Sequence, residues 1–186
     1  MSQHASSHYD PLSRALHWAT AILVVIAFLL GPEHFGRLMH QGVDPATRSA
    51  IVWHESLGIT IFVLTLLRLI WVALRPSTPR FEMSVKMQMA AKLAHLALWG
   101  ILFLLPVTAI LALGSEGLPL TLLGNVRMEK IPFISESGLV HLADWGDVHI
   151  LLGDAIMWLA GLHAAATIYH HVVLKDGVLM AMMPHR

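Results

Sequence analysis

Residues 148–174 read VHILLGDAIMWLAGLHAAATIYHHVVL, and this stretch says most about how the chain folds. Its histidines His149 and His163 are fourteen residues apart, close to four turns of an α-helix, so both lie on nearly one face. At 1.5 Å of rise per residue they are separated by roughly 21 Å, about two-thirds of a ~30 Å hydrocarbon core. A membrane helix with this spacing can hold one metal centre near each surface.

The composition is that of a membrane protein. The 186 residues are 56% hydrophobic and only 13% charged, with a mean hydropathy of +0.65. Twelve Lys and Arg balance twelve Asp and Glu, so the charge gives no support to a nucleic-acid partner. The chain has no cysteine, which excludes disulfides, iron–sulfur clusters and covalently attached c-type haem. Any haem would therefore be a non-covalent b type, and the thirteen histidines are its candidate ligands.

Four apolar runs are long enough to cross a bilayer, at about 15–31, 51–74, 93–113 and 148–174. We therefore predict an all-α integral membrane four-helix bundle, with 1–186 as a single domain. The first run contains His17 and Trp18 and lacks a small-x-small cleavage site, so we interpret it as a retained helix rather than a secretory signal. Pro76 is expected to end the second helix, and Pro106 to kink the third.

Basic residues predict the orientation of the bundle. The connection between the second and third runs, and the C-terminal tail, are basic, which is typical of cytoplasmic segments: Arg75, Arg80, Lys86, Lys92, Lys175 and Arg186. Both termini are then cytoplasmic. The connection over 114–147 lies outside and is too long for a tight turn, so we expect it to pack over the outer mouth as a lid or a short surface helix.

Depth in the bilayer sorts the histidines of the spans into two pairs. His17 and His163 are both expected toward the inner surface, and His54 and His149 toward the outer surface. Two depth-matched pairs are what two bis-histidine b-type haems require. Glycines near these ligands leave room for a flat porphyrin, although small residues equally suit helix packing in membranes: Gly58, Gly153 and Gly161.

Other polar residues near the inner surface have two interpretations each. Arg68 lies about two turns inside its span and either binds a haem propionate or reaches the interface as a snorkelling side chain. His95 is a fifth histidine at the inner depth, which could bind a propionate or quinone, or replace one of the ligands. His170 and His171 either contact quinone or anchor the helix at the headgroups.

Short motifs in order along the chain resemble the bacterial four-helix branch of the cytochrome b561 family, of the superoxide oxidase type. The similarity runs from Arg14 to Pro184, and these strings carry it: Arg14-Ala-Leu-His17-Trp18, His54-Glu-Ser-Leu-Gly58, Leu93-Ala-His95-Leu96, Gly161-Leu-His163-Ala, His170-His171 and Met182-Met183-Pro184.

The resemblance implies haem ligation by His17 with His163 and by His54 with His149. It also implies an oxidoreductase of the bacterial inner membrane that passes electrons from superoxide to ubiquinone. Superoxide is an anion, so basic residues of the outer connections are candidates to steer it: Arg37, Arg48, Arg127 and Lys130. Residues near the inner haem are candidates to bind quinone or relay protons: His95, His170 and Lys175. The sequence equally allows a quinone site on the outer side.

Two alternatives stay open. A haem b membrane anchor would carry electrons between a dehydrogenase or hydrogenase partner and quinone. A histidine-rich metal transporter without haem is the third class, but the spans show no run of carboxylates or broken helices to mark an ion path.

Overall fold

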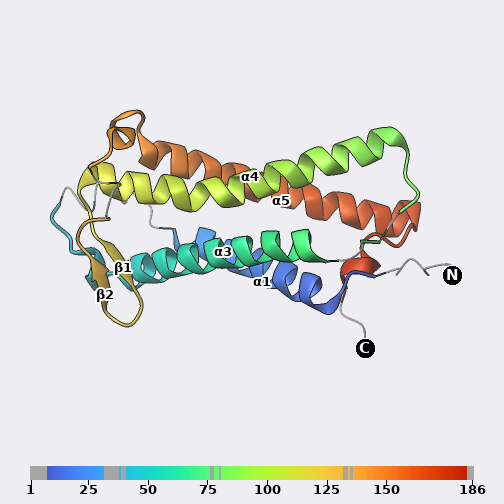
Figure 1. The fold of residues 1–186 in the computed structure, drawn as a ribbon, viewed down its shortest axis with the longest axis horizontal. Helices are drawn as coiled ribbons and strands as arrows, with labels where there is room; N and C mark the ends of the chain where they lie inside the picture. The colour runs from blue at the N-terminus through green and yellow to red at the C-terminus, as the bar shows by residue number, and fades with distance from the viewer. Residues whose placement is uncertain are drawn as a thin grey trace.

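A computed structural model describes residues 8–31, 38, 41–75, 78–79, 81–131, 134 and 136–183. Four long helices dominate it (Figure 1): α1 (Pro11–Leu30), α3 (Ser49–Leu74), α4 (Val85–Glu116) and α5 (Trp145–Tyr169). A single π-helical turn, η3 (His170–Leu174), continues α5. The smaller elements are three 3₁₀ turns and two strands, namely η1 (Pro45–Thr47), η2 (Gly138–His141), η4 (Met180–Met182), β1 (Leu120–Leu122) and β2 (Val126–Met128).

All four predicted spans are helices that are long and apolar enough to cross a membrane. The second ends at Leu74, as predicted. The third is longer than the predicted 93–113, because it starts eight residues earlier, at Val85. There the side chain of Ser84 accepts a hydrogen bond from the Met87 N–H, as an N-cap does. The apolar pattern did not reveal this first part because its polar turns lie outside the hydrophobic run.

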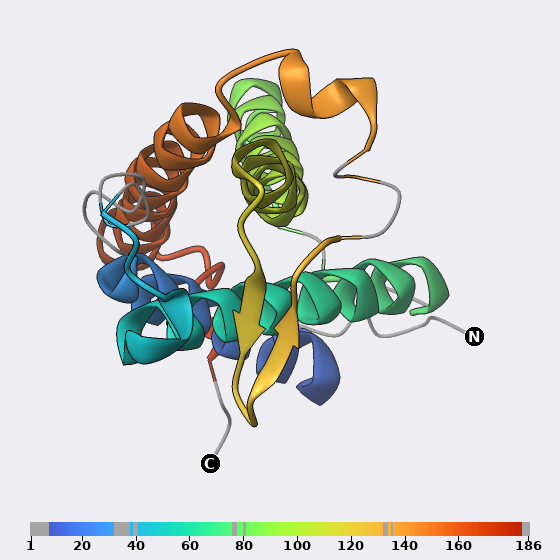
Figure 2. The ribbon, with the colours of Figure 1, turned by 90° about the vertical axis from the view of Figure 1, so that its left-hand side faces the viewer.

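The helices form two layers, with α1 packed against α3 and α4 packed against α5. Figure 2, which views the bundle end-on, shows the two pairs facing each other. The core that joins them takes one buried residue from each helix: Ala27, Ile61, Leu102 and Ile156. Most other apolar side chains lie on the outside, as expected where lipid rather than water surrounds the protein.

Both terminal segments meet at one end of the bundle, which we call the terminal end. The Tyr9 N–H donates to the Ala181 carbonyl over 3.1 Å, and the Trp18 indole N–H donates to the Met182 carbonyl over 2.9 Å. Asp10 caps α1 there by accepting from the Ser13 N–H at 2.8 Å. Each span carries the chain to the opposite end of the bundle, so four spans bring the C-terminal segment back to the end where α1 starts.

A β-hairpin marks the opposite end, which we call the hairpin end. Strands β1 and β2 pair antiparallel, with Leu122 opposite Val126. The turn between them places Gly124 at φ +77° and Asn125 at φ +61°, a backbone that these two residue types tolerate best. The connection over 114–147 therefore contains the short helix that we expected, as η2, and also a hairpin that we did not predict. The Gly124-Asn125 pair was the signal for it.

Candidate functional site

His54 and His149 face each other near the hairpin end. His54 comes from α3 and His149 from α5, and their ring centres are 6.1 Å apart with the planes at 84°. Two imidazoles that bind one metal ion from opposite sides, with metal–nitrogen distances of about 2.0 Å, have ring centres about 6 Å apart. The spacing of this pair therefore fits a shared metal centre.

Backbone carbonyls orient both rings of this pair. His54 Nδ1 lies 2.8 Å from the Ala27 oxygen, and His149 Nδ1 lies 3.0 Å from the Leu105 oxygen and 3.2 Å from Thr108 Oγ1. A carbonyl only accepts, so Nδ1 carries the proton in each ring and Nε2 keeps a lone pair. Metal-binding histidines commonly have this arrangement, in which a hydrogen bond at Nδ1 leaves Nε2 available as a ligand atom.

The Ala27 carbonyl is available because of the way α1 ends. The Gly31 N–H bonds to the Phe28 oxygen at 3.1 Å instead of to Ala27. The Ala27 carbonyl, in the last helical turn, is thereby left without this backbone donor. The His54 ring donates a hydrogen bond to it instead.

Three histidines from three helices gather nearer the terminal end. His17 of α1 and His163 of α5 have ring centres 6.5 Å apart, with the planes at 67°. His95 of α4 lies closer to His163, at 5.3 Å. The spacing of His17 and His163 is the nearer match to the about 6 Å of two ligands on one metal ion. Among the described residues, no group of three or more His, Cys, Asp or Glu side chains is arranged so that it could hold a metal ion by itself.

Arg68 lies against this group. Its Nη2 is 3.2 Å from His17 Nδ1, and its guanidinium stacks 4.8 Å above the centre of the Trp99 ring. A guanidinium only donates, so His17 Nδ1 accepts here and its proton lies on Nε2. Metal binding through Nε2 would require this hydrogen bond to change. No carboxylate in the described part of the chain forms an ion pair with Arg68, so its charge is available to another anion.

His170, in the π-helical turn, forms a close pair with Asp176. Its Nδ1 contacts Asp176 Oδ2, while Asp176 Oδ1 accepts from the Val178 N–H at 3.2 Å. Burial opposes ionisation of Asp176, but the hydrogen bonds outweigh it and lower the pKa of this carboxyl. His171, the neighbour of His170, is exposed.

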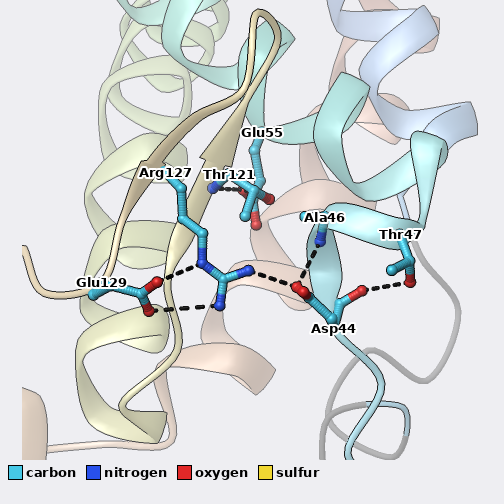
Figure 3. Close-up of polar contacts among 7 residues, drawn as sticks. All are labelled: Asp44, Ala46, Thr47, Glu55, Thr121, Arg127 and Glu129. Carbon is cyan, nitrogen blue, oxygen red and sulfur yellow. Dashed lines mark hydrogen bonds and ion pairs between the residues drawn. The ribbon is translucent and has the colours of Figure 1, made fainter.

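The basic residues predicted to steer an anion have different surroundings. Arg127 is paired with two carboxylates, Asp44 and Glu129, each at 2.6 Å (Figure 3). These bonds lower the pKa of Asp44 and raise that of Arg127. The group as a whole is negative, so Arg127 offers less positive potential to an anion than an unpaired arginine would. Arg48 and Lys130 are exposed, and Arg37 lies outside the described residues.

Glu55 is a site residue that the sequence interpretation missed. It follows His54 directly, and its Oε2 accepts from Thr121, through the backbone N–H at 2.5 Å and the hydroxyl at 2.8 Å (Figure 3). The next residue, Ser56, accepts from the Leu123 N–H at 2.9 Å. The hairpin is thus fastened to α3 beside the His54 and His149 pair. A carboxylate inside an apolar run was the signal for this role.

Comparisons with known proteins found a family model and several relatives that match nearly the whole chain. The family model for prokaryotic cytochrome b561 matches residues 8–185. A probable superoxide oxidase CybB of Yersinia pestis is 32% identical, over 96% of this chain and 97% of that protein. Cytochrome b561 homolog 2 of Escherichia coli K12 is 27% identical, over 94% of this chain and 90% of its own length. Cytochrome b562 of Cereibacter sphaeroides is 29% identical, over 96% of both chains.

Proposed function

The chain belongs to the prokaryotic cytochrome b561 family, and from that premise we propose a specific activity for this membrane b-type cytochrome. It holds two haems and passes electrons from superoxide to ubiquinone. In the overall reaction, two superoxide ions, one ubiquinone and two protons become two oxygen molecules and one ubiquinol. The observation that carries the proposal is the presence of two histidine pairs, at 6.1 and 6.5 Å, at two levels of one bundle.

Four histidines would hold the haems in this proposal. His54 and His149 bind one, and His17 and His163 bind the other. Bound haem supplies reversible one-electron chemistry at its iron. The protein orients the rings, keeps water out with the surrounding apolar side chains, and offers Arg68 to a haem propionate, an anion that its guanidinium can bind through paired hydrogen bonds. His95 stands beside His163 as a neighbour rather than a ligand.

Ubiquinone reduction also needs protons, and the terminal end offers a group that can supply them. Donation of the His170 Nδ1–H to Asp176 leaves Nε2 free to accept or deliver a proton. We therefore place the quinone near this end, with His170 as its main polar contact and with His95 and Lys175 as further candidates.

Superoxide would react at the hairpin end. The relative from Yersinia pestis carries the name of a probable superoxide oxidase, and its similarity extends over nearly the whole chain. Arg48 and Lys130 are exposed at this end and are the basic residues left to attract an anion, because Arg127 is neutralised by its partners.

We also infer a location in the bacterial inner membrane, where the basic connections would orient the terminal end toward the cytoplasm. Fusion of a reporter enzyme that is active only outside the cytoplasm, inserted at Gly124 in the hairpin turn or after the C-terminus, tests this orientation. The hairpin fusion should be active and the C-terminal fusion inactive.

A superoxide pulse tests the activity itself. Purified, oxidised protein in lipid nanodiscs receives potassium superoxide without oxygen, and the absorbance of reduced haem is followed before and after ubiquinone is added. We expect haem reduction and then reoxidation with formation of ubiquinol, and no reduction when superoxide dismutase is present from the start. Haem that stays oxidised after the pulse would rule out superoxide as donor and favour an anchor that receives electrons from a protein partner.

A further inference from the structure

Asp154 is a carboxylic acid on the outer surface of a membrane span. It lies in α5, nine residues after Trp145, or about 14 Å along the helix at 1.5 Å per residue. The side chain is exposed, and it is absent from every hydrogen bond and ion pair of the described residues. In a bilayer, such a group is costly and calls for a partner.

The two haem-pair histidines lie on the other side of the same helix. With 3.6 residues per turn, Asp154 is rotated by about 140° from His149 and by about 180° from His163. Its surroundings are the exposed apolar residues Leu151 and Trp158, at 67% and 77% exposure. Asp154 therefore faces the lipid and not the interior of the bundle.

Exposed residues follow Asp154 along α5 with alternating spacings of four and three. We call this stripe the α5 seam; it consists of Asp154, Trp158, Gly161, Ala165 and Ile168. A seam with this spacing is the pattern by which two parallel helices pack along their length. The bundle leaves it unused, since α5 packs chiefly against α4, and Figure 2 shows α5 at the edge of the bundle.

Gly161 supports contact with another chain. A Cβ added at Gly161 would meet no other atom within 4 Å, so the packing of this chain does not require a glycine there. A glycine within a helix is less stable than alanine. With Ala165 four residues later, it forms the small-xxx-small spacing that lets membrane helices approach closely.

We propose that the α5 seam binds the α5 seam of a second copy of this chain, in a parallel two-fold dimer. Two copies inserted in the same orientation carry Asp154 at the same depth, and a two-fold contact brings identical residues together. In this contact the two Asp154 side chains lie against each other, so neither carboxyl group is left facing the lipid alone. The remaining seam residues are small or apolar and offer no charge for a basic partner helix.

Cysteine cross-linking tests the dimer directly, because the natural chain has no cysteine. The variant Ala165→Cys places a thiol on the seam, and Ile22→Cys places one on the exposed face of α1, where the parent residue is 56% exposed. The haem-loaded proteins, in native membranes, are oxidised with copper phenanthroline. We expect a disulfide-linked product of about twice the 20.5 kDa chain for Ala165→Cys only.

Two further changes in the Ala165→Cys background separate packing from misfolding. Gly161→Leu should reduce the cross-linked product at least tenfold while the haem absorption spectrum stays as in the parent. Asp154→Asn, which keeps a donor and an acceptor, should retain the product. The proposal is overturned by equal cross-linking at Ile22→Cys, by no product at Ala165→Cys, or by a product of a different mass, which would indicate another protein on this face. None of these readouts depends on superoxide or quinone activity.

Discussion

His54 Nδ1 lies 2.8 Å from the carbonyl oxygen of Ala27, at the end of a different helix. This one hydrogen bond joins α1 to α3 and also determines which ring nitrogen of His54 can bind a metal. His149 has the same arrangement with Leu105. The pair at the hairpin end is thus oriented for ligation by the fold itself, whereas His17 is held by Arg68 through the opposite ring tautomer.

Removal of either histidine at the hairpin end should cost one haem. We expect His54→Ala and His149→Ala each to keep only the haem proposed for His17 and His163. Conversely, His17→Ala and His163→Ala should each keep only the haem proposed for His54 and His149. Haem content from the pyridine haemochrome spectrum counts the groups, and redox titration shows which one is missing. If all four variants lost the same spectral component, the assignment of two separate pairs would be wrong.

His95 should be dispensable for haem content. Its ring centre is 5.3 Å from that of His163, closer than two ligands on opposite sides of one iron allow. We expect His95→Ala to retain two haems per chain, with at most a change in the potential of one of them. Loss of a haem from this variant alone would instead make His95 a ligand.

Arg68→Gln should lower the reduction potential of the haem held by His17 and His163. A half-buried positive charge stabilises the reduced, more negative form more than the oxidised form, and a difference of about 1.4 kcal/mol between the two forms is a tenfold change in equilibrium. For a one-electron couple a tenfold change is about 59 mV. Arg75→Gln is the matched control, since Arg75 bonds to Ser13 instead. An equal shift in both variants would show a general effect of surface charge.

Glu55→Ala should release the hairpin from α3. The carboxylate accepts two hydrogen bonds from Thr121, and a hydrogen bond to a charged group contributes about 1.5–3 kcal/mol. Hydrogen exchange followed by mass spectrometry should show at least tenfold faster exchange across β1 and β2. Ser56→Ala, which removes only the bond from the Leu123 N–H, should have a smaller effect. Unchanged exchange in Glu55→Ala would mean that other contacts hold the hairpin.

Asp176 should stabilise the protein in a pH-dependent way. Its pKa in the folded chain is below the ordinary value of 3.8, so the charged form favours folding. That contribution is complete above the unfolded pKa and disappears as the pH falls through the folded pKa. We expect Asp176→Asn to melt about 2–4 °C lower than the parent at pH 7, as for a loss of about 1 kcal/mol. The gap should be smaller at a second, lower pH, and it should close as the pH falls through the folded pKa of Asp176. A gap of the same size at both pH values would show that the charge of Asp176 is not involved.

The sequence alone was sufficient to predict the four spans and which histidines of the spans lie at the same level of the bundle. Hydrophobic runs of this length have no other stable form in a bilayer, and helical rise converts residue spacing into depth. The single-faced spacing of His149 and His163 follows from helical geometry, and the end of the second span at Leu74 follows from the proline two residues later.

The tertiary structure decided which groups touch at a given depth. Depth placed His95 level with His17 and His163, but only helix packing shows that His95 is the closer neighbour of His163. Arg127 looked like a free positive charge until the fold brought Asp44 to it across 83 residues of chain. Glu55 acquired its role in the same way. Periodicity reports distance along a helix axis, whereas hydrogen bonds and ion pairs depend on how separate helices and loops turn toward one another. The relative rotation of helices and loops depends on residues throughout the chain, so it cannot be deduced from the spacing within one segment.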